Sequence, residues 1–131
     1  MAGPVRNTRA MIAQMSPRLD ERHWCFVAVT PDRAPELLGA AIGTFREDEG
    51  VSAIVPAALA PEGAPAFARI VLEVNSDLEG VGLTAAVASR LAEAGIACNM
   101  VAALHHDHAF VPAERAEEAL DLLLDLSASQ G

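Results

Sequence analysis

Three of the four histidines stand in one short run, His105-His106-Asp107-His108. Imidazole nitrogens and carboxylate oxygens are good ligands for zinc and other transition metals, and an imidazole can also act as a general acid or base near neutral pH. In an extended segment alternate residues share a face, so His106 lies with His108 and the other two residues lie opposite. Two ligands on one face are too few for a closed site. We therefore interpret the run as a polar hairpin turn, with a ligand pocket, a metal site that also uses a bent turn or a neighbouring chain, and a His-dependent enzyme as alternatives.

The other residues with reactive side chains form no catalytic pattern. Cys25 and Cys98 are far apart in the sequence and lie among apolar residues, which is typical of buried cysteines rather than of a metal site or a disulfide framework. The acidic run 47–49 precedes Gly50 and is interpreted as a solvated turn, with a cation site as the alternative. The chain contains no lysine, which excludes Schiff-base chemistry and a Walker-type phosphate loop. We expect no catalytic residue and no cofactor.

The amino-acid composition limits the classes of partner that the protein can bind. The 131 residues are 52% hydrophobic, so a packed core is expected, and the length suits one domain's worth of structure. Nine arginines face eighteen acidic residues, which gives a formal net charge of -9, and the arginines do not cluster. Nucleic-acid binding draws on basic patches, so nucleic acids are excluded as partners. Because no apolar run is long enough to cross a bilayer and no signal peptide is evident, we expect a cytoplasmic protein without a membrane span.

The first half of the chain predicts a strand-helix-strand order. A short helix over residues 8–16, stopped by Pro17, precedes it. Aromatic and β-branched residues predict a strand over 23–30, an apolar run predicts a helix over 36–45, and a second strand follows over 51–56. Two prolines and a glycine mark 57–66 as the connector between the halves.

The second half predicts the order β-α-β-β-α. A strand over 67–75 precedes a Ser76-x-x-Glu79 capping box and a helix that ends at Gly95. Strands over 96–104 and 109–112 flank a turn at 105–108, and the last helix covers about 113–127. A helical crossover implies parallel strands, and the short turn implies an antiparallel hairpin. This order is that of a ferredoxin-like α+β sandwich that lacks its final strand, which must come from the other half or from another subunit. Element order alone suggests that the first half is a fragmentary duplicate.

A family resemblance rests on specific segments. The run VNSDLEGVGL at 74–83 and the helix that ends LAEAGI at 91–96 resemble the first βαβ of an ACT domain. The pieces 45–55, 82–88 and 96–112 resemble a small group of uncharacterised bacterial proteins with two ACT-like units. The resemblance implies an antiparallel sheet with helices on one face, a βαββα ACT-like half at 67–127, and a degenerate ACT-like half with the N-terminal helix at 1–60.

The resemblance also implies a ligand site. ACT domains typically pair side by side through their sheets and bind an amino acid at the interface, where the strand-to-helix turn of one unit meets the second strand of its neighbour. Matched to this sequence, the turn supplies Asn75, Ser76, Asp77, Leu78, Gly80 and Val81, and the strand supplies Cys98, Asn99 and Met100. Unpaired N–H groups at a helix start can hold a carboxylate, and Asp77 can accept from an ammonium group. The alternative for the turn is that Ser76 and Glu79 only cap the helix.

These observations predict a non-catalytic regulatory module that binds a small molecule, expected to be an amino acid. Open sheet edges and the apolar content favour a homodimer. The alternative is a protein-protein assembly module without a metabolite ligand.

Overall fold

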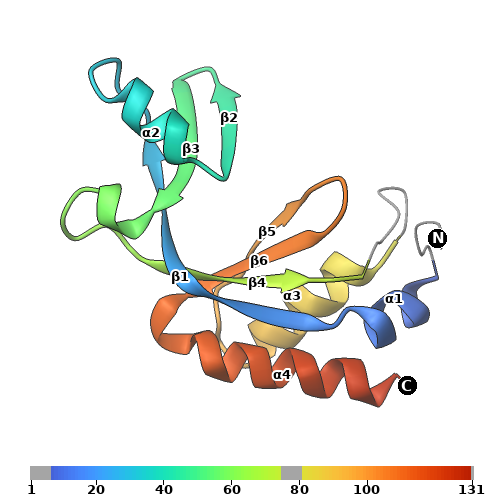
Figure 1. Cartoon of the computed structure of the whole chain (residues 1–131). Coiled ribbons are helices and arrows are strands. Elements are labelled where there is room, and N and C mark those ends of the chain that lie inside the picture. Colours follow the sequence, from blue (N-terminus) through green and yellow to red (C-terminus); the bar gives the residue numbers. More distant parts are fainter. Residues whose placement is uncertain (1–6, 75–80, 131) are drawn as a thin grey trace. The chain divides into compact units, whose positions relative to one another are not determined.

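The structure, a computed structural model, describes residues 7–74 and 81–130. The chain forms two compact units, and Figure 1 shows its elements coloured along the sequence. Unit 1 contains the residues up to Glu21 together with those from Ala68 onward, and unit 2 is Arg22–Phe67. The long strand β1 (Pro17–Ala28) begins in unit 1 and ends in unit 2. No helix in the described part of the chain is long and apolar enough to cross a membrane.

The sheet of unit 1 has the strand order β1-β4-β6-β5. Its other strands are β4 (Phe67–Leu72), β5 (Asn99–Ala102) and β6 (Asp107–Pro112). The hairpin of β5 and β6 is antiparallel, as the short turn predicted, although the turn lies at 103–106 rather than at 105–108. The crossover from β4 to β5 does not make these two strands pair, because β6 lies between them.

Three helices cover one face of this sheet. They are α1 (Thr8–Gln14), α3 (Leu83–Glu93) and α4 (Ala116–Ser129), which follows a short 3-10 turn, η2 (Ala113–Arg115). The three helices pack against one another, and the Ser127 hydroxyl donates to the Ala13 carbonyl at 3.0 Å. Alternate residues of β4 enter the core beneath them, as expected for a strand with one face buried. The core includes Met11, Met15, Ile70, Leu72, Leu83, Val87, Leu91, Val111, Ala119 and Leu123.

The start of β1 supplies the strand that the second half lacks. The Glu73 N–H donates to the Met15 carbonyl at 2.6 Å, and Arg69 binds Asp20 across the two strands. Met15 lies just before β1 and Glu73 just after β4, whereas Asp20 lies further along β1 and Arg69 earlier in β4, so the strands run antiparallel. The fourth strand therefore comes from the N-terminal part of the same chain.

Unit 2 has the strand order β2-β3-β1, and each neighbouring pair is antiparallel. Its elements are the second part of β1, α2 (Ala34–Ala40), β2 (Gly43–Glu47), β3 (Gly50–Pro56) and the 3-10 turn η1 (Ala57–Leu59). The predicted helix over 36–45 was too long, because α2 ends at Ala40 and Gly43 begins a strand that the sequence reading missed. Pairing with β3 places Phe45 opposite Ser52, and this ladder prevails over the helical pattern.

The two units differ after their last pair of corresponding strands, which are β3 in unit 2 and β6 in unit 1. The sequence Val-Pro-Ala-x-x-Ala occurs at 55–60, where β3 runs into η1, and again at 111–116, where β6 runs into η2. In unit 1 Glu117 follows and α4 continues for 14 residues. In unit 2 Pro61 follows, and a proline lacks the N–H and clashes with the carbonyl four residues earlier. The helix therefore stops in unit 2, and the connector takes its place.

Candidate functional site

Of the turn residues predicted to bind a ligand, the structure describes only the last one, Val81. Asn75, Ser76, Asp77, Leu78 and Gly80 lie outside the described residues, as does Glu79 of the proposed capping box. Val81 is 77% exposed, and Gly82 is the residue before α3 with a φ of +107°. The Thr8 hydroxyl donates to the Val81 carbonyl, so the first residue of α1 contacts the segment that enters α3. A Cβ on Gly82 would lie 2.6 Å from the Thr8 methyl group, so glycine is required there by both φ and space.

The strand residues that the resemblance implied lie at the edge of the sheet. Asn99 is exposed and begins β5, whereas Met100 and Cys98 are partly buried against the core of unit 1. Burial raises the pKa of the Cys98 thiol, which favours the unreactive protonated form. Cys25 is also buried, and burial raises the pKa of its thiol too.

Among the described residues, the backbone of β5 has a neighbouring strand on one side only. This strand ends the strand order of the sheet and has β6 as its neighbour. The Ala103 N–H donates to the His106 carbonyl, which fixes the alternation of the ladder. Because Val101 then faces β6, the N–H groups of Met100 and Ala102 point away from it. The exposed edge can therefore accept another strand.

The histidine run lies partly in the hairpin turn and partly in β6. His105 is exposed, His106 ends the turn, and Asp107 and His108 begin β6, with Asp107 only 7% exposed. The Nδ1 atoms of His106 and His108 are buried and have no hydrogen-bond partner among the described residues. Within the described ranges, no group of three or more His, Cys, Asp or Glu residues could hold a metal ion.

His108 lies in a positive environment. Its pKa is lowered first by burial and then by the charges of Arg69, His106 and Arg18, while Asp107 raises it. The two arginines belong to a band of ion pairs on β1 and β4. Arg69 binds Asp20 at 2.9 Å with both side chains largely buried, and Arg18 binds Glu73 at 2.7 Å in a more exposed pair. Burial and these charges together favour the neutral form of the His108 imidazole.

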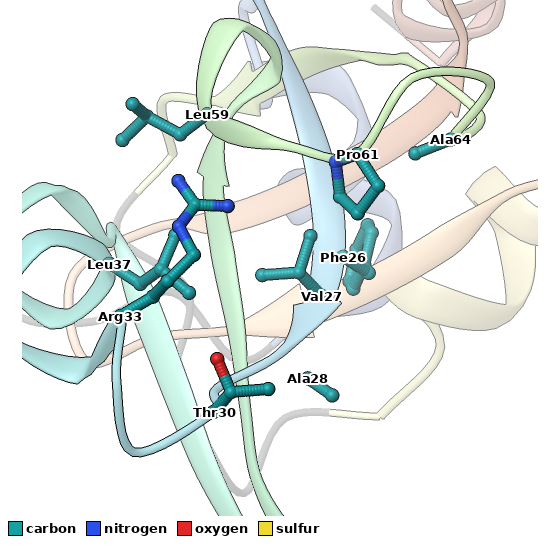
Figure 2. Close-up of a pocket in the computed structure, with 9 residues that line it drawn as sticks. All are labelled: Phe26, Val27, Ala28, Thr30, Arg33, Leu37, Leu59, Pro61 and Ala64. Atoms are coloured by element: carbon teal, nitrogen blue, oxygen red, sulfur yellow. The ribbon is translucent and has the colours of Figure 1, made fainter.

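Unit 2 contains a pocket of about 400 Å³ that the sequence reading missed. Figure 2 shows its lining side chains, which come from β1, the segment between β1 and α2, α2 itself and the connector 57–66. Most of them are apolar: Phe26, Val27, Ala28, Leu37, Leu59, Pro61 and Ala64, with Thr30 and Arg33 as the polar members.

The charge in this pocket is a guanidinium. Arg33 lies just before α2, and its Nε and Nη2 atoms donate to one oxygen of Glu36 at 2.9 and 2.5 Å. A guanidinium has five donors, so this pair leaves further donors available. The Arg33 side chain is 37% exposed and that of Glu36 is 55% exposed, so the ion pair lies open to solvent.

The signal for this pocket was present in the sequence. Pro56 ends β3, and prolines at 61 and 65 interrupt the segment that follows. Gly63 has a φ of +84° in the turn closed by the Ala64 N–H and the Pro61 carbonyl. Comparison of the two Val-Pro-Ala segments shows that a helix is missing from the first half. A sheet face that loses its covering helix exposes apolar side chains, and this was the available clue.

Both halves of this chain resemble known proteins. Residues 4–66 and residues 64–125 each match a family model described as ACT domain. A solved protein of unknown function from Vibrio cholerae, described as a possible transport protein, is 39% identical over 88% of this chain and 92% of its own, with a TM-score of 0.75. No curated protein matches the chain.

More distant solved structures share the fold. A protein from Agrobacterium tumefaciens is 18% identical over 85% of this chain and 87% of its own, with a TM-score of 0.62. The regulatory subunit of aspartate kinase from Thermus thermophilus, in a ligand-free form, is 17% identical over 85% of this chain and 97% of its own, with a TM-score of 0.55. The two adjoining matches, the antiparallel sheet and these neighbours agree: the chain belongs to the ACT-domain family and carries two ACT repeats.

Proposed function

We propose that this protein is a non-catalytic regulatory module of the cytoplasm that binds an amino acid. ACT domains are regulatory modules that typically bind small molecules, and both repeats of the chain match that family. Among the solved structures with the same fold is a regulatory subunit of aspartate kinase, an enzyme named for an amino acid. The family membership of both repeats is the observation that carries this proposal.

The proposed ligand site combines the turn before α3 with β5. Its turn residues are Asn75, Ser76, Asp77, Leu78, Gly80 and Val81, and its strand residues are Cys98, Asn99 and Met100. One feature of the described residues supports this choice. Asn99 offers an exposed amide at the sheet edge.

The proposed working form is a homodimer. The free edge of β5 allows two copies of unit 1 to join their sheets, which is the side-by-side pairing that the resemblance to ACT domains implies. Such an arrangement couples ligand binding to assembly, because a ligand held by both copies stabilises the dimer.

A thermal-shift screen against the twenty amino acids tests the proposal. A ligand at a hundredfold excess over its dissociation constant stabilises the folded state by about 2.7 kcal/mol, which raises Tm by several degrees. We expect one selective amino acid to give this shift. The shift should be lost in Asp77→Asn and in Asn99→Ala and kept in Gln14→Ala, an exposed polar substitution in α1.

The remaining outcomes discriminate the alternatives. A flat screen would reject amino-acid binding and favour the assembly module. An equal shift in Asn99→Ala and in the unsubstituted protein would place the ligand elsewhere.

A further inference from the structure

We propose that unit 2 contains a second binding site, for a small carboxylic acid with an apolar body. The site is the pocket of about 400 Å³ beneath the connector, and all of its lining residues belong to unit 2. It is separate from the turn and strand of the proposed function, which lie in unit 1, and it does not depend on them.

The pocket exists because a helix is missing. Helix α2, with seven residues, packs on β3, and the core beneath it consists of Leu37, Ala53 and Val55. In unit 1 a helix continues after the second Val-Pro-Ala segment, whereas in unit 2 Pro61 ends the turn. The part of the sheet face that such a helix would fill is bordered instead by Leu59, Pro61 and Ala64, and the space between them is the pocket.

The apolar side chains that line the pocket favour a ligand with an apolar body. Phe26 is 43% exposed although it is a large aromatic residue, and its ring packs edge-to-face on Phe67 with centroids 5.5 Å apart. This packing holds the ring in place as one wall, and Val27 and Leu37 form another wall across β1 from it. Burial of an apolar group against these side chains is favourable by about 25 cal/mol per Å² of area removed from water.

The positive charge of Arg33 favours a carboxylate group on the ligand. Figure 2 shows the Arg33 guanidinium extending beside Leu37 toward Leu59, at the side of the pocket that holds the connector. The planar guanidinium matches a carboxylate in bidentate geometry, and Glu36 occupies only part of its donor set. At the other end of the pocket Thr30 offers a hydroxyl.

Strand β1 adds backbone hydrogen-bonding groups at the base of the pocket. The Val29 N–H donates to the Val51 carbonyl at 2.9 Å, so Val29 and Val27 face β3 in the antiparallel ladder. The N–H and C=O of Ala28 therefore point away from β3. Ala28 also lines the pocket, so polar backbone atoms are available there for a substituent on the acid, such as an amino or keto group.

The volume limits the size of the acid. Since each water molecule takes about 30 Å³ of the liquid, a pocket of about 400 Å³ accepts a ligand of roughly ten non-hydrogen atoms. Leucine, phenylalanine and their analogues without the amino group, 4-methylpentanoate and 3-phenylpropanoate, have this size and chemistry.

An NMR titration of the full-length protein with these four acids tests the site. We expect at least one acid to bind saturably with a Kd of about 1 mM or tighter and to shift the amide signals of Ala28, Thr30 and Leu59. The amide counterpart, for example 3-phenylpropanamide, should bind about ten-fold more weakly because it cannot pair with Arg33.

Matched variants test whether Arg33 is the residue whose charge binds the acid. Arg33→Gln should weaken binding of the acid about ten-fold, whereas Arg46→Gln, which removes an equal charge from an exposed position on β2, should leave it unchanged. Glu36→Gln frees the guanidinium and should strengthen binding roughly three-fold. Arg33 makes no side-chain cap to α2, so the folded state should tolerate its substitution, and the dispersion of the amide spectrum verifies this.

Three results would overturn the proposal: no saturable binding of any of the four acids, equal binding of acid and amide, or equal losses in Arg33→Gln and Arg46→Gln. Shifts confined to Val81 and Asn99 would also reject this site, while they would support the proposed function in unit 1.

Discussion

Gly82 joins the proposed ligand turn to α3 and has little freedom to change. Its φ of +107° is costly for any residue with a side chain, and a Cβ would lie within 3 Å of both the methyl group and the hydroxyl of Thr8. Thr8 also donates to the Val81 carbonyl. One residue of α1 thus contacts both residues that lead into α3, so the two helices restrain the end of the turn together.

Substitution of this glycine should be destabilising. We expect Gly82→Ala to lower the free energy of unfolding by about 1–3 kcal/mol, measured by urea denaturation. Gly39→Ala is the control, because Gly39 lies inside α2 with open space around its Cβ position, and alanine there should be neutral or stabilising by up to about 1 kcal/mol. Equal effects of the two substitutions would refute the argument from φ and space.

His108 links stability to pH. Its pKa in the folded state is lowered from 6.5, chiefly by burial, so between the folded and the unfolded value the unfolded state binds more protons. Its contribution to stability is therefore complete above about pH 6.5 and is lost as the pH falls through the window below that value. We expect His108→Gln to lessen the loss of stability between pH 7.5 and pH 5.5, as measured by urea unfolding midpoints. His105→Gln, at the exposed position of the same hairpin, should retain the full loss.

At the scale of elements, the strands β1 and β4 are joined by two ion pairs of different burial. The Asp20 and Arg69 side chains are 7% and 15% exposed, whereas those of Glu73 and Arg18 are 42% and 55% exposed. Removal of one partner from a buried pair leaves an uncompensated charge, while an exposed pair is screened by water. The pairs therefore differ in what they contribute to holding the fourth strand in place.

The difference is measurable with matched variants. Asp20→Ala should lower the free energy of unfolding by about 3 kcal/mol, and Glu73→Ala should lower it by about 1 kcal/mol or less. Chemical denaturation at low and at high salt measures both values, and only the Glu73→Ala effect should shrink in high salt. Similar losses in the two variants would contradict the inference that the buried pair of Asp20 and Arg69 contributes more than the exposed pair of Glu73 and Arg18.

The elements also show where sequence reasoning succeeds and where it fails. Helix α1, strand β3 and the hairpin of β5 and β6 follow from local patterns, because their apolar periodicity and their turn residues agree. Strand β2 was missed, since Gly43 and Thr44 continue an apolar run and only the ladder with β3 makes them extended. The pocket of unit 2 was missed for a related reason, because it depends on the helix that Pro61 prevents.

At the scale of the whole molecule, the free edge of β5 is the feature that bears on assembly. The Ala102 N–H points away from β6, and Ala102 is exposed, so a proline there removes an outward donor without removing a ladder bond. If two copies pair through this edge, each dimer loses the contribution of two such groups.

We expect light scattering to give twice the 13.7-kDa chain mass for the unsubstituted protein. For Ala102→Pro we expect a monomer, or a dimer weakened about ten-fold or more. The control Ala102→Thr keeps the N–H and should remain dimeric. A monomer at all concentrations in the unsubstituted protein would reject the homodimer, and a dimer unaffected by the proline would move the interface away from β5.

The sequence by itself determined the ACT family and the βαββα order of the second half. These follow from local signals, namely turn residues, periodicity and a strand-to-helix motif, which act over a few residues. The tertiary structure decided that the start of β1 completes the sheet of unit 1, that β6 separates β4 from β5, and that unit 2 contains an apolar pocket with Arg33 at its side. Each of these depends on which distant segments pack together, because strand pairing and burial arise from contacts between residues far apart in the chain, which no local pattern encodes.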